Sequence, residues 1–308
     1  MFPKIAVFGA SGFIGGHLVN KLRLDGYNVI GVQRGSKVIK DAHNLALDSH
    51  NEENVVRFLN DAGITHIINT IGKAHDLRKT SEQDELMYMR ANVDLTDKIA
   101  AAAKFSKVSK LILLSSSKIY GNLVSSENPS EHKVGRNLNT YGKTKYEGEK
   151  ALLQRLKGSK IRPIIIRMPL VYGKNVKGNL MSLKNAIARG LPLPFKNITA
   201  NRRSMLSISN LYSFLLMVLF SDKIEGYIFN LKDREDYSTA QIINNIMLAN
   251  DINGKIFGIN DKILTVLLNS FSAQLAEKIT GNDTINDSFA RAKLSWEPKG
   301  PNLEDFRL

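Results

Sequence analysis

Tyr141 and Lys145 are the two residues of this sequence whose types and spacing most directly indicate chemistry. Four residues apart, they share one face of a helix, where the lysine ammonium can hold the tyrosine hydroxyl and lower its pKa. A tyrosine tuned in this way can carry a proton near neutral pH. Upstream, the run Ser115-Ser116-Ser117 ends an apolar segment, and one of its hydroxyls can hydrogen-bond the substrate oxygen that Tyr141 protonates or deprotonates. The pattern predicts a proton-transfer site.

A glycine-rich segment near the N-terminus predicts a dinucleotide site. It follows a predicted strand and opens a predicted helix, and its glycines allow a tight turn and close approach of a pyrophosphate to the helix N-terminus. The spacing is G-x-x-G-x-x-G rather than G-x-G-x-x-G, and a glycine-rich turn without a ligand is the alternative. The residues predicted to contact the cofactor here are Gly9, Ser11, Gly12, Phe13, Ile14 and Gly15.

The end of the second predicted strand bears on the choice between NAD and NADP. An acidic residue at this place would bond the adenosine ribose and favour NAD. The chain instead has Gln33 and Arg34, with Lys37 nearby, and an amide followed by a guanidinium suits a 2′-phosphate. NADP(H) is therefore favoured as a cofactor, with NAD(H) as the alternative. In a second interpretation, Arg34 is only a solvated loop residue.

These residues are positioned by a regular alternation of strands and helices. Short apolar runs separated by amphipathic stretches are typical of βαβ units, so the expected fold class is α/β, a Rossmann-type doubly wound parallel sheet. Strands are predicted at 5–8, 28–32, 66–70, 110–115 and 161–167, and helices at 15–25, 54–62, 86–105 and 141–156.

After Gly173 the pattern is less regular, with helices expected at 179–189, 209–220 and 240–249. We expect residues 1–173 to form the NAD(P)-binding domain, with later segments returning to it. Residues 174–308 should form mainly a smaller C-terminal substrate-binding lobe.

Composition narrows the function classes. The 308 residues include no cysteine, which excludes disulfides, thiolate metal sites and cysteine nucleophiles, and no metal site is predicted. The net charge of +14 favours an anionic partner, but the basic residues form no run of roughly five or six. Zinc-finger spacing and an aromatic RNA-binding signature are also missing from the sequence. Phosphorylated small molecules therefore fit better than nucleic acid.

The predicted localisation is the cytoplasm. A strand begins at Ile5, which leaves no room for a secretory signal. The most apolar runs, 211–220 and 263–268, fall short of the ~20 residues of a membrane-spanning helix and are expected to be core helices. A membrane- or scaffold-associated subunit is an alternative, motivated by the net charge and the apolar stretch Ile263–Leu275. It requires a basic face exposed beside that stretch.

At these motifs the chain resembles the extended short-chain dehydrogenase/reductases, the NAD-dependent epimerase/dehydratase family. Members carry the G-x-x-G-x-x-G loop, a Ser or Thr four residues before a Tyr-Gly pair, and Tyr-x-x-x-Lys. Aligned on Tyr120-Gly121, the resemblance implies that Ser116 is the catalytic hydroxyl, Tyr141 the acid/base and Lys145 its partner. It also implies further cofactor contacts: Asp48 at the adenine, Ile71 and Gly72 after the strand 66–70, Pro169 under the nicotinamide, and Tyr141 and Lys145 themselves.

Downstream, the sequence looks most like bacterial UDP-sugar 4-epimerases and 4-ketoreductases of surface-polysaccharide synthesis. The resemblance implies that Asn179 and Arg203 hold the diphosphate of a nucleotide sugar, that Phe195 lines the uracil pocket, and that Ser116 contacts the sugar. A guanidinium suits a diphosphate because it can bond phosphate through two N–H groups. The alternatives are that Phe195 is a core residue and Arg203 a solvated charge. The implied partners are the nucleotide-sugar substrate and a second copy of the chain in a homodimer.

Two departures from the family narrow the chemistry to redox at one carbinol carbon. Sugar dehydratases carry Asp-Glu directly after the catalytic hydroxyl, where this chain has Ser117-Lys118, and epimerase-reductases of the GDP-fucose type use a cysteine. We rank a UDP-4-keto-hexose or -hexosamine reductase slightly ahead of a UDP-hexose or UDP-N-acetylhexosamine 4-epimerase with retained NAD, because Gln33-Arg34 suits NADP. A non-catalytic dinucleotide-binding sensor is a remote alternative, since Tyr141 and Lys145 are both present.

Overall fold

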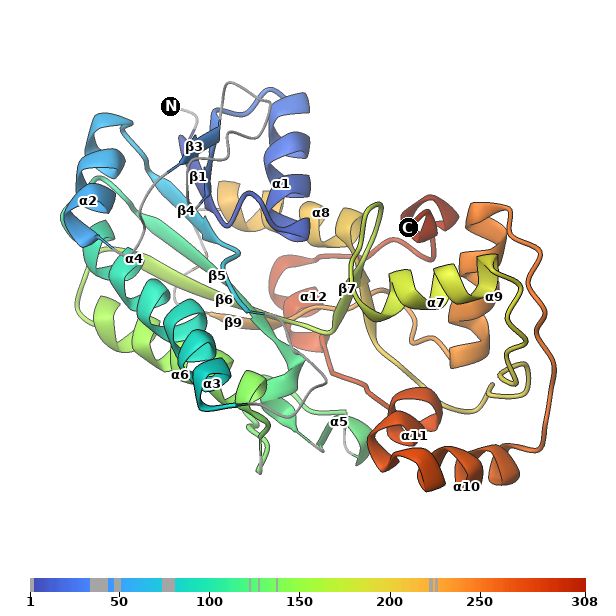
Figure 1. Ribbon diagram of the computed structural model, residues 1–308. Coiled ribbons are helices and arrows are strands. Elements are labelled where there is room, and N and C mark those ends of the chain that lie inside the picture. The colour runs from blue at the N-terminus through green and yellow to red at the C-terminus, as the bar shows by residue number, and fades with distance from the viewer. Residues whose placement is uncertain are drawn as a thin grey trace. The chain divides into compact units, whose positions relative to one another are not determined.

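The computed structural model describes residues 3–33, 44–46, 51–73, 81–121, 123–126, 128–136, 138–221, 224 and 227–308. The chain divides into two compact units, shown in Figure 1. Unit 1 comprises Met1–Gly121, Val134–Arg167 and Phe214–Asn230, and unit 2 comprises Asn122–Lys133, Met168–Ser213 and Leu231–Leu308. Both units are therefore assembled from segments that are distant in the sequence.

Within the described residues, unit 1 is built on a seven-stranded sheet with the order β3-β2-β1-β4-β5-β6-β9. Every strand pair whose register is described runs parallel, with Ile5 opposite Val29 and His66 on its two neighbours. This order is the doubly wound arrangement, so the predicted α/β Rossmann-type fold is confirmed. The strands are β1 (Ile5–Phe8), β2 (Val29–Gln33), β3 (Asn44–Ala46), β4 (His66–Asn69), β5 (Lys110–Ser116), β6 (Arg162–Met168) and β9 (Ile228–Asn230).

The inner strands are apolar on both faces because helices cover both sides of the sheet. All residues of β1 and β5 are buried, as expected for parallel strands between two helical layers. One side is covered by α2 (Glu52–Asp61), α4 (Leu95–Ala103) and α6 (Thr140–Leu156), and the other by α1 (Phe13–Leu24) and the last part of α8 (Ile208–Phe220) (Figure 1). The core against the first set includes Phe8, Leu59, Ile67, Ile99, Leu111 and Leu152.

The segment predicted as one helix over 86–105 consists of three pieces. α3 (Glu82–Met89) begins at Ser81, whose hydroxyl accepts a hydrogen bond from the backbone N–H of Asp84 in a capping box. A π-helical turn, η1 (Arg90–Asp94), then separates α3 from α4. Such a turn widens the helix by one residue and re-aims the side chains around it. Asn92 of this turn is buried in unit 1.

Two glycines of α6 allow this helix to lie against backbone atoms of its neighbours. A Cβ at Gly142 would overlap the carbonyl oxygen of Lys118 in the 3₁₀ turn η2 (Ser117–Tyr120). A Cβ at Gly148 would overlap the carbonyl oxygen of Asn92. The Asn139 side chain caps α6 by accepting from Gly142 N at 2.8 Å. The first half of α6 is thereby held against both η2 and η1.

Unit 2 contains a two-stranded parallel sheet of β7 (Leu170–Tyr172) and β8 (Met205–Ser207). The helices predicted at 179–189 and 240–249 are confirmed as α7 and α9, whereas β7, β8, α11 and α12 have no counterpart among the predicted elements. The helical elements are α5 (Leu123–Ser126), α7 (Asn179–Ala188), α9 (Thr239–Asn250), α10 (Asp261–Phe271), α11 (Ala273–Thr280), α12 (Ser288–Leu294) and the 3₁₀ turn η3 (Leu303–Phe306).

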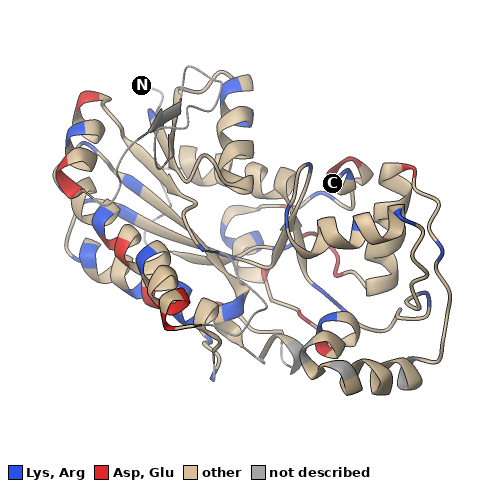
Figure 2. Cartoon of the chain, viewed as in Figure 1, with Lys and Arg blue, Asp and Glu red and all other residues tan. Residues whose placement is uncertain are grey.

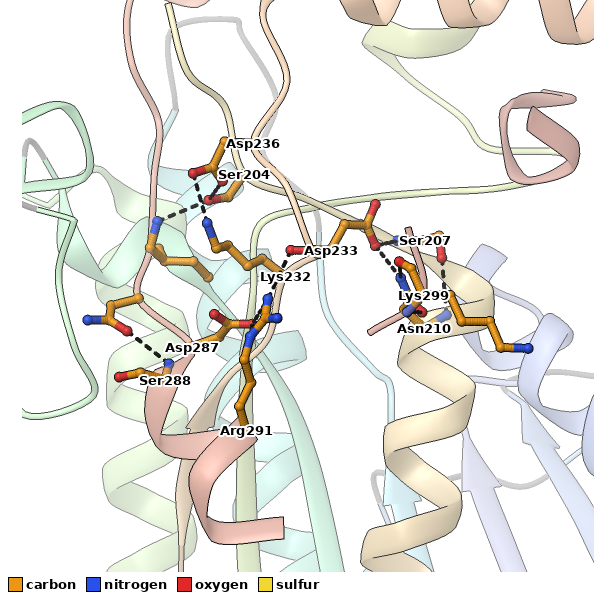
Figure 3. A network of polar contacts seen from close by, with 12 residues as sticks. Ser204, Ser207, Asn210, Lys232, Asp233, Asp236, Asp287, Ser288, Arg291 and Lys299 are labelled. Atoms are coloured by element: carbon orange, nitrogen blue, oxygen red, sulfur yellow. Dashed lines mark hydrogen bonds and ion pairs between the residues drawn. The ribbon is translucent and has the colours of Figure 1, made fainter. Parts of the chain in front are cut away.

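Buried polar contacts organise the centre of unit 2, as Figure 3 shows around Asp233. The Asp233 carboxylate accepts hydrogen bonds from Ser207 N at 2.9 Å and from Asn210 Nδ2 at 2.7 Å. It also accepts from the Tyr172 hydroxyl at 2.7 Å, and Asn210 Oδ1 accepts from Lys299 N at 2.9 Å. A buried carboxylate needs such donors to offset its lost hydration. The contacts join β7, β8, the start of α8 and two loops.

Gly148→Ala is expected to destabilise unit 1, because the added methyl group would overlap the Asn92 carbonyl oxygen and force α6 away from η1. We expect the free energy of unfolding to fall by about 1–2 kcal/mol, since overpacking exceeds the gain of alanine over glycine in a helix. Urea denaturation followed by circular dichroism measures the change. Gln154→Ala, at an exposed position of the same helix, is the matched control and should have an effect below about 0.5 kcal/mol. Equal losses in the two variants would contradict the packing argument.

Candidate active site

The glycine loop connects the carboxyl end of β1 to the first turn of α1. Gly9 has a φ of +88°, a conformation that favours glycine, and a Cβ there would lie 2.6 Å from Thr70 Oγ1. A Cβ at Gly15 would overlap the Gly9 carbonyl oxygen, so this glycine lets α1 approach the loop. Gly12 is the N-cap of α1, and neither a side-chain cap nor an acidic residue occupies the first turn. The N–H groups of this turn therefore suit a phosphate.

Other predicted cofactor residues of unit 1 follow neighbouring strands. Gln33 is the last residue of β2 and is buried. Ile71 and Gly72 follow β4, where Ile71 N donates to Asn69 Oδ1 at 3.0 Å. Because β1, β2 and β4 are parallel neighbours, the segments after them meet at one edge of the sheet. In the glycine loop and first turn of α1, Ser11 is exposed, and Phe13 and Ile14 are half-buried.

Two predicted cofactor residues, Arg34 and Asp48, lie outside the described residues, as does Lys37. The described feature that bears on the cofactor is therefore the end of β2. The residue at that end is Gln33, whereas an acidic residue there would bond the adenosine ribose 2′-hydroxyl and favour NAD.

The three predicted catalytic residues, called the catalytic trio below, converge at the carboxyl end of β5. Ser116 is the last residue of β5, and Tyr141 and Lys145 lie in the first two turns of α6. The Ser116 and Tyr141 side chains are hydrogen-bonded to each other, and Lys145 Nζ donates to the Leu114 carbonyl oxygen at 2.7 Å. A Cβ at Gly72 would lie 3.6 Å from Lys145 Nζ. The fold therefore brings the trio together beside the segment that follows β4.

Burial shifts the pKa values of both helix residues of the trio. It raises the pKa of the Tyr141 phenol, and the hydrogen bond with Ser116 acts in the opposite direction. It lowers the pKa of the Lys145 ammonium to about 8, and the Glu149 carboxylate acts in the opposite direction. The predicted lowering of the Tyr141 pKa by Lys145 is therefore not what these surroundings produce, because desolvation of the phenol is the largest effect and raises the pKa.

Two residues near the trio are missing from the predicted set. Tyr88 on α3 is buried, and its ring centre lies 6.4 Å from that of Tyr141. Asn92 on η1 donates through Nδ2 to Thr144 Oγ1 at 2.9 Å and accepts from Lys73 N at 3.0 Å. Both belong to the segment predicted as one continuous helix. Its apolar spacing carries no sign of the π-helical turn that aims Asn92 inward.

Lys73 adds a cation close to this group. Its Nζ pairs with Asp84 at 2.8 Å and lies 4.8 Å from the centre of the Tyr88 ring. The hydrogen bond from Lys73 holds the pKa of Asp84 at about 2, well below its ordinary value. This ion pair joins α3 to the segment that follows β4.

The remaining predicted residues belong to unit 2. Pro169 lies between β6 and β7 and is half-buried. Asn179 is the first residue of α7. Gly178, the residue before it, has a φ of +78°, and its backbone forms the N-cap of that helix without a side-chain bond. Asn179 therefore stands at a helix N-terminus, where an anion is stabilised.

Phe195 and Arg203 do not match their alternative interpretations within unit 2. Phe195 is half-buried and forms a backbone bridge with Gly258, so it is not a residue of the buried core. The Arg203 guanidinium donates to the Gly281 carbonyl oxygen at 3.1 Å and pairs with Asp283 at 3.4 Å, so it is not a free solvated charge. Arg203 is thus held in place by protein groups.

The apolar stretch Ile263–Leu275 forms α10 and the start of α11. The expectation of a core helix is wrong for α10, where Ile263, Val266 and Leu267 are 59%, 68% and 48% exposed. Figure 2 shows Lys and Arg spread over many elements of both units and interleaved with Asp and Glu, without a cluster on the described part of α10. The exposed apolar face that the membrane-associated alternative requires is therefore present on α10. None of the helices in the described ranges combines the length and apolar character needed to cross a membrane.

Comparison with known proteins places these features in a family. A family model described as "NAD dependent epimerase/dehydratase family" matches residues 5–231. The UDP-glucose 4-epimerase of Vibrio cholerae is 28% identical, over 99% of this chain and 94% of its own length. The N-acetyl-alpha-D-glucosaminyl-diphospho-ditrans,octacis-undecaprenol 4-epimerase of Escherichia coli O157:H7 is 26% identical, over 91% of this chain and 82% of its own length.

Among solved structures, that of MoeE5 in complex with UDP-glucose and NAD superposes on this chain with a TM-score of 0.78. The two chains are 21% identical, and the match covers 98% of this chain and 96% of MoeE5. At that identity the likeness establishes the fold. The doubly wound sheet and the segments of unit 2 thus have counterparts over almost the whole chain.

Lys145→Met is expected to stabilise the protein at neutral pH. The pKa of Lys145 is about 8 in the folded chain, against an ordinary value of 10.5, so the buried ammonium opposes folding at pH 7. We expect the free energy of unfolding to rise on the order of 1–3 kcal/mol, the lost bond to Leu114 offsetting part of the gain. The gain should shrink between about pH 8 and pH 10, because the wild-type lysine is then neutral when folded but still protonated when unfolded.

Chemical denaturation across this pH range measures the difference between Lys145→Met and the wild type. Lys143→Met, at an exposed position two residues earlier in the same helix, is the matched control and should show neither the gain nor its pH dependence. A Lys145→Met protein that is no more stable than the wild type at pH 7 would contradict the burial argument.

Proposed function

Because the chain belongs to the NAD dependent epimerase/dehydratase family, we propose that it interconverts C4 epimers of a nucleotide-linked hexose or N-acetylhexosamine with a nicotinamide cofactor. The family resemblance of its motifs is confirmed, and the chain is an enzyme of the extended short-chain dehydrogenase/reductase kind. One observation carries the proposal. The Ser116 and Tyr141 side chains are hydrogen-bonded at the carboxyl end of β5, with Lys145 one turn further along α6.

The glycine loop fits a dinucleotide. Gly9 and Gly15 leave no room for a side chain, and the first turn of α1 offers N–H groups and contains no acidic residue, which suits a pyrophosphate. When bound, a nicotinamide dinucleotide supplies and accepts the hydride. The segment after β4 lies between this loop and Lys145, since Gly72 is near Lys145 Nζ and Thr70 near Gly9.

The trio handles the proton. In the oxidative half-reaction, Tyr141 takes the proton of the C4 hydroxyl while C4 loses a hydride, and in the reductive half it returns the proton to the carbonyl oxygen. Ser116, already bonded to Tyr141, is placed to hydrogen-bond that same oxygen. Burial raises the pKa of Tyr141, so its phenolate requires a cation, and Lys145, one turn further along α6, is the residue proposed to provide it.

We propose that the protein binds its substrate through a nucleotide diphosphate. The Vibrio cholerae relative is named for a UDP-sugar, and the helix N-terminus at Asn179 and the guanidinium of Arg203 are chemically suited to a diphosphate. Binding through Arg203 would exchange its present partners, Gly281 and Asp283, for phosphate oxygens. Phe195 is the proposed contact of the base.

We favour the epimerase over the reductase because both sequence relatives described above are named as 4-epimerases. This reverses the order expected from the sequence. A 4-ketoreductase is the second candidate, favoured by Gln33, because no carboxylate at the end of β2 would repel the 2′-phosphate of NADP(H). An epimerase returns the hydride to the same sugar and consumes no cofactor, whereas a reductase consumes NADPH.

The deciding experiment incubates the purified chain with UDP-glucose or UDP-N-acetylglucosamine in the presence of NAD or NADP. A parallel reaction contains a UDP-4-keto-sugar and NADPH. A polyprenyl-diphosphate-linked N-acetylhexosamine is a further substrate, because the Escherichia coli relative is named for such a lipid-linked sugar. Product sugars are separated by chromatography, and reduced nicotinamide is followed by absorbance.

We expect C4 epimers to form without net change in reduced nicotinamide. Consumption of NADPH with the 4-keto-sugar would instead establish the reductase. If neither the epimers nor the reduced sugar forms with any of these substrates, the proposed function is wrong.

Tyr141→Phe is expected to lower kcat by about 10²–10⁴-fold, because the proton carrier is lost, while dinucleotide binding is retained. Turnover and dinucleotide binding by fluorescence titration are measured on the same preparation. Tyr146→Phe, on the same helix with its ring beside Lys150, is the matched control and should keep wild-type turnover. A Tyr141→Phe enzyme with near-normal turnover would contradict the role of the phenol.

A further inference from the structure

A buried ion pair lies one helical turn beyond Lys145. Glu149 on α6 and Arg167 on β6 each have a side chain that is 2% exposed, and Arg167 Nη2 lies 2.6 Å from Glu149 Oε2. Arg167 Nε also donates to the two carboxylate oxygens at 3.1 and 3.2 Å. Removing two charges from water is costly, and an apolar pair would often be as stable. Because this pair carries a desolvation penalty, a role beyond stability is a reasonable explanation for it.

Both members of the pair are bonded to elements that carry the catalytic trio. Glu149 accepts a hydrogen bond from Ser115 Oγ, the residue before the catalytic serine in β5. Arg167 Nη1 donates to the Tyr120 hydroxyl of η2 at 3.1 Å. That hydroxyl in turn donates to Asn230 Oδ1 of β9 at 2.6 Å. One buried network thus joins α6, β5, η2, β6 and β9 within unit 1.

We propose that Glu149, held by Arg167, is a positioning residue that fixes Lys145 and Ser116 relative to Tyr141. The proposal rests on the proposed function of the trio. Through Ser115, the carboxylate fixes the end of β5 against α6, and Lys145 bonds the same strand at Leu114 from one turn earlier. The hydroxyl of Ser116 and the phenol of Tyr141 come from these two elements, so their alignment depends on this link.

The same carboxylate acts as counter-charge to Lys145. The two residues are four apart on α6, and Glu149 raises the pKa of Lys145 against the effect of burial. Lys145 can support a phenolate at Tyr141 only in its cationic form. Without Glu149 the pKa of Lys145 would fall, so Lys145 would lose its charge, and the phenolate its support, at a lower pH than in the wild type. Among the described residues, the titratable and charged groups near the Lys145–Glu149 pair include Tyr141 on α6, Arg167 on β6 and Tyr120 on η2. Tyr88 on α3 lies beside Tyr141, with Lys73 over its ring.

Glu149→Gln tests the proposal, because it keeps the side-chain shape and removes the charge. We expect the pKa of Lys145 to fall by about one pH unit. The pKa is measured by NMR on protein labelled at lysine Cε, and the Lys145 signal is assigned by its loss in Lys145→Met. We also expect kcat to fall at least about tenfold with KM little changed, and the alkaline limb of the kcat profile to move to lower pH.

Asp97→Asn is the matched control. Asp97 on α4 forms an ion pair with Arg155 on α6, with Arg155 Nη2 2.6 Å from Asp97 Oδ2. The variant therefore also removes a carboxylate that pairs with an arginine, but in a solvent-exposed pair. The pKa of Lys145 and kcat should both stay at their wild-type values in this variant.

Arg167→Lys separates geometry from charge. It keeps the positive charge but cannot bond Glu149 and Tyr120 together in the way a guanidinium does. We expect a several-fold lower kcat with the pKa of Lys145 unchanged, in a protein that still unfolds cooperatively. If Glu149→Gln does not fold, this variant decides, and wild-type kcat in Arg167→Lys overturns the proposal.

Glu149→Gln with wild-type values for both the Lys145 pKa and kcat likewise overturns the proposal. A purely structural role of Glu149 would lower stability without moving the pKa of Lys145 or the pH profile. The pKa measurement needs no substrate. If the enzyme converts none of the C4 substrates, the proposed function is wrong, but the NMR measurement still shows whether Glu149 controls the pKa of Lys145.

Discussion

The close approach of α6 to its neighbours is the constraint on which the site depends. At Gly142 and Gly148, the helix meets the carbonyl oxygens of Lys118 and Asn92 with no side chain between them. These two contacts set the height and rotation of the helix turns that carry Tyr141. Any side chain larger than hydrogen would push the phenol away from the end of β5. The Tyr-Gly-Lys order is therefore as much a packing requirement as a chemical pattern.

A second constraint is the handling of buried charge in unit 1. Lys110 is buried, and its Nζ donates to the carbonyl oxygens of Val218, Leu219 and Ser221 at 2.6, 3.0 and 3.0 Å, at the end of α8. That lysine is satisfied by backbone and serves the joining of helix to sheet. Lys145 has one described backbone bond, to β5, and the field of a carboxylate. Burial lowers the pKa of Lys145 to about 8, and the Glu149 carboxylate opposes that shift only in part.

Much of unit 1 could be predicted from the sequence because its signals are local. The glycine loop, the strand that ends at Ser116 and the helix of Tyr141 follow from apolar runs, caps and spacing, and each lies within two residues of its predicted bounds. The π-helical turn at Asn92 could not be predicted, since it leaves the helical pattern intact. Strands of three residues such as β3, β7, β8 and β9 are too short to show a period. The pairing of Glu149 with Arg167 depends on tertiary structure, and so does the burial that raises the pKa of Tyr141.

The protonation of Tyr141 connects the proposed chemistry to the buried ion pair. A 4-ketoreductase begins with the phenol, the form that burial favours, and uses Tyr141 once as an acid. A 4-epimerase must begin with a base, so it needs the phenolate at the start of each turnover and the phenol at the midpoint. In the proposed mechanism, the charged form of Lys145 stabilises that phenolate. Burial makes this charged form less favourable, because it lowers the pKa of Lys145 to about 8. Tyr141 also becomes a phenolate when it gives its proton to a 4-keto oxygen, so either reaction depends on a charged Lys145, and the buried Glu149–Arg167 pair beneath the trio serves both.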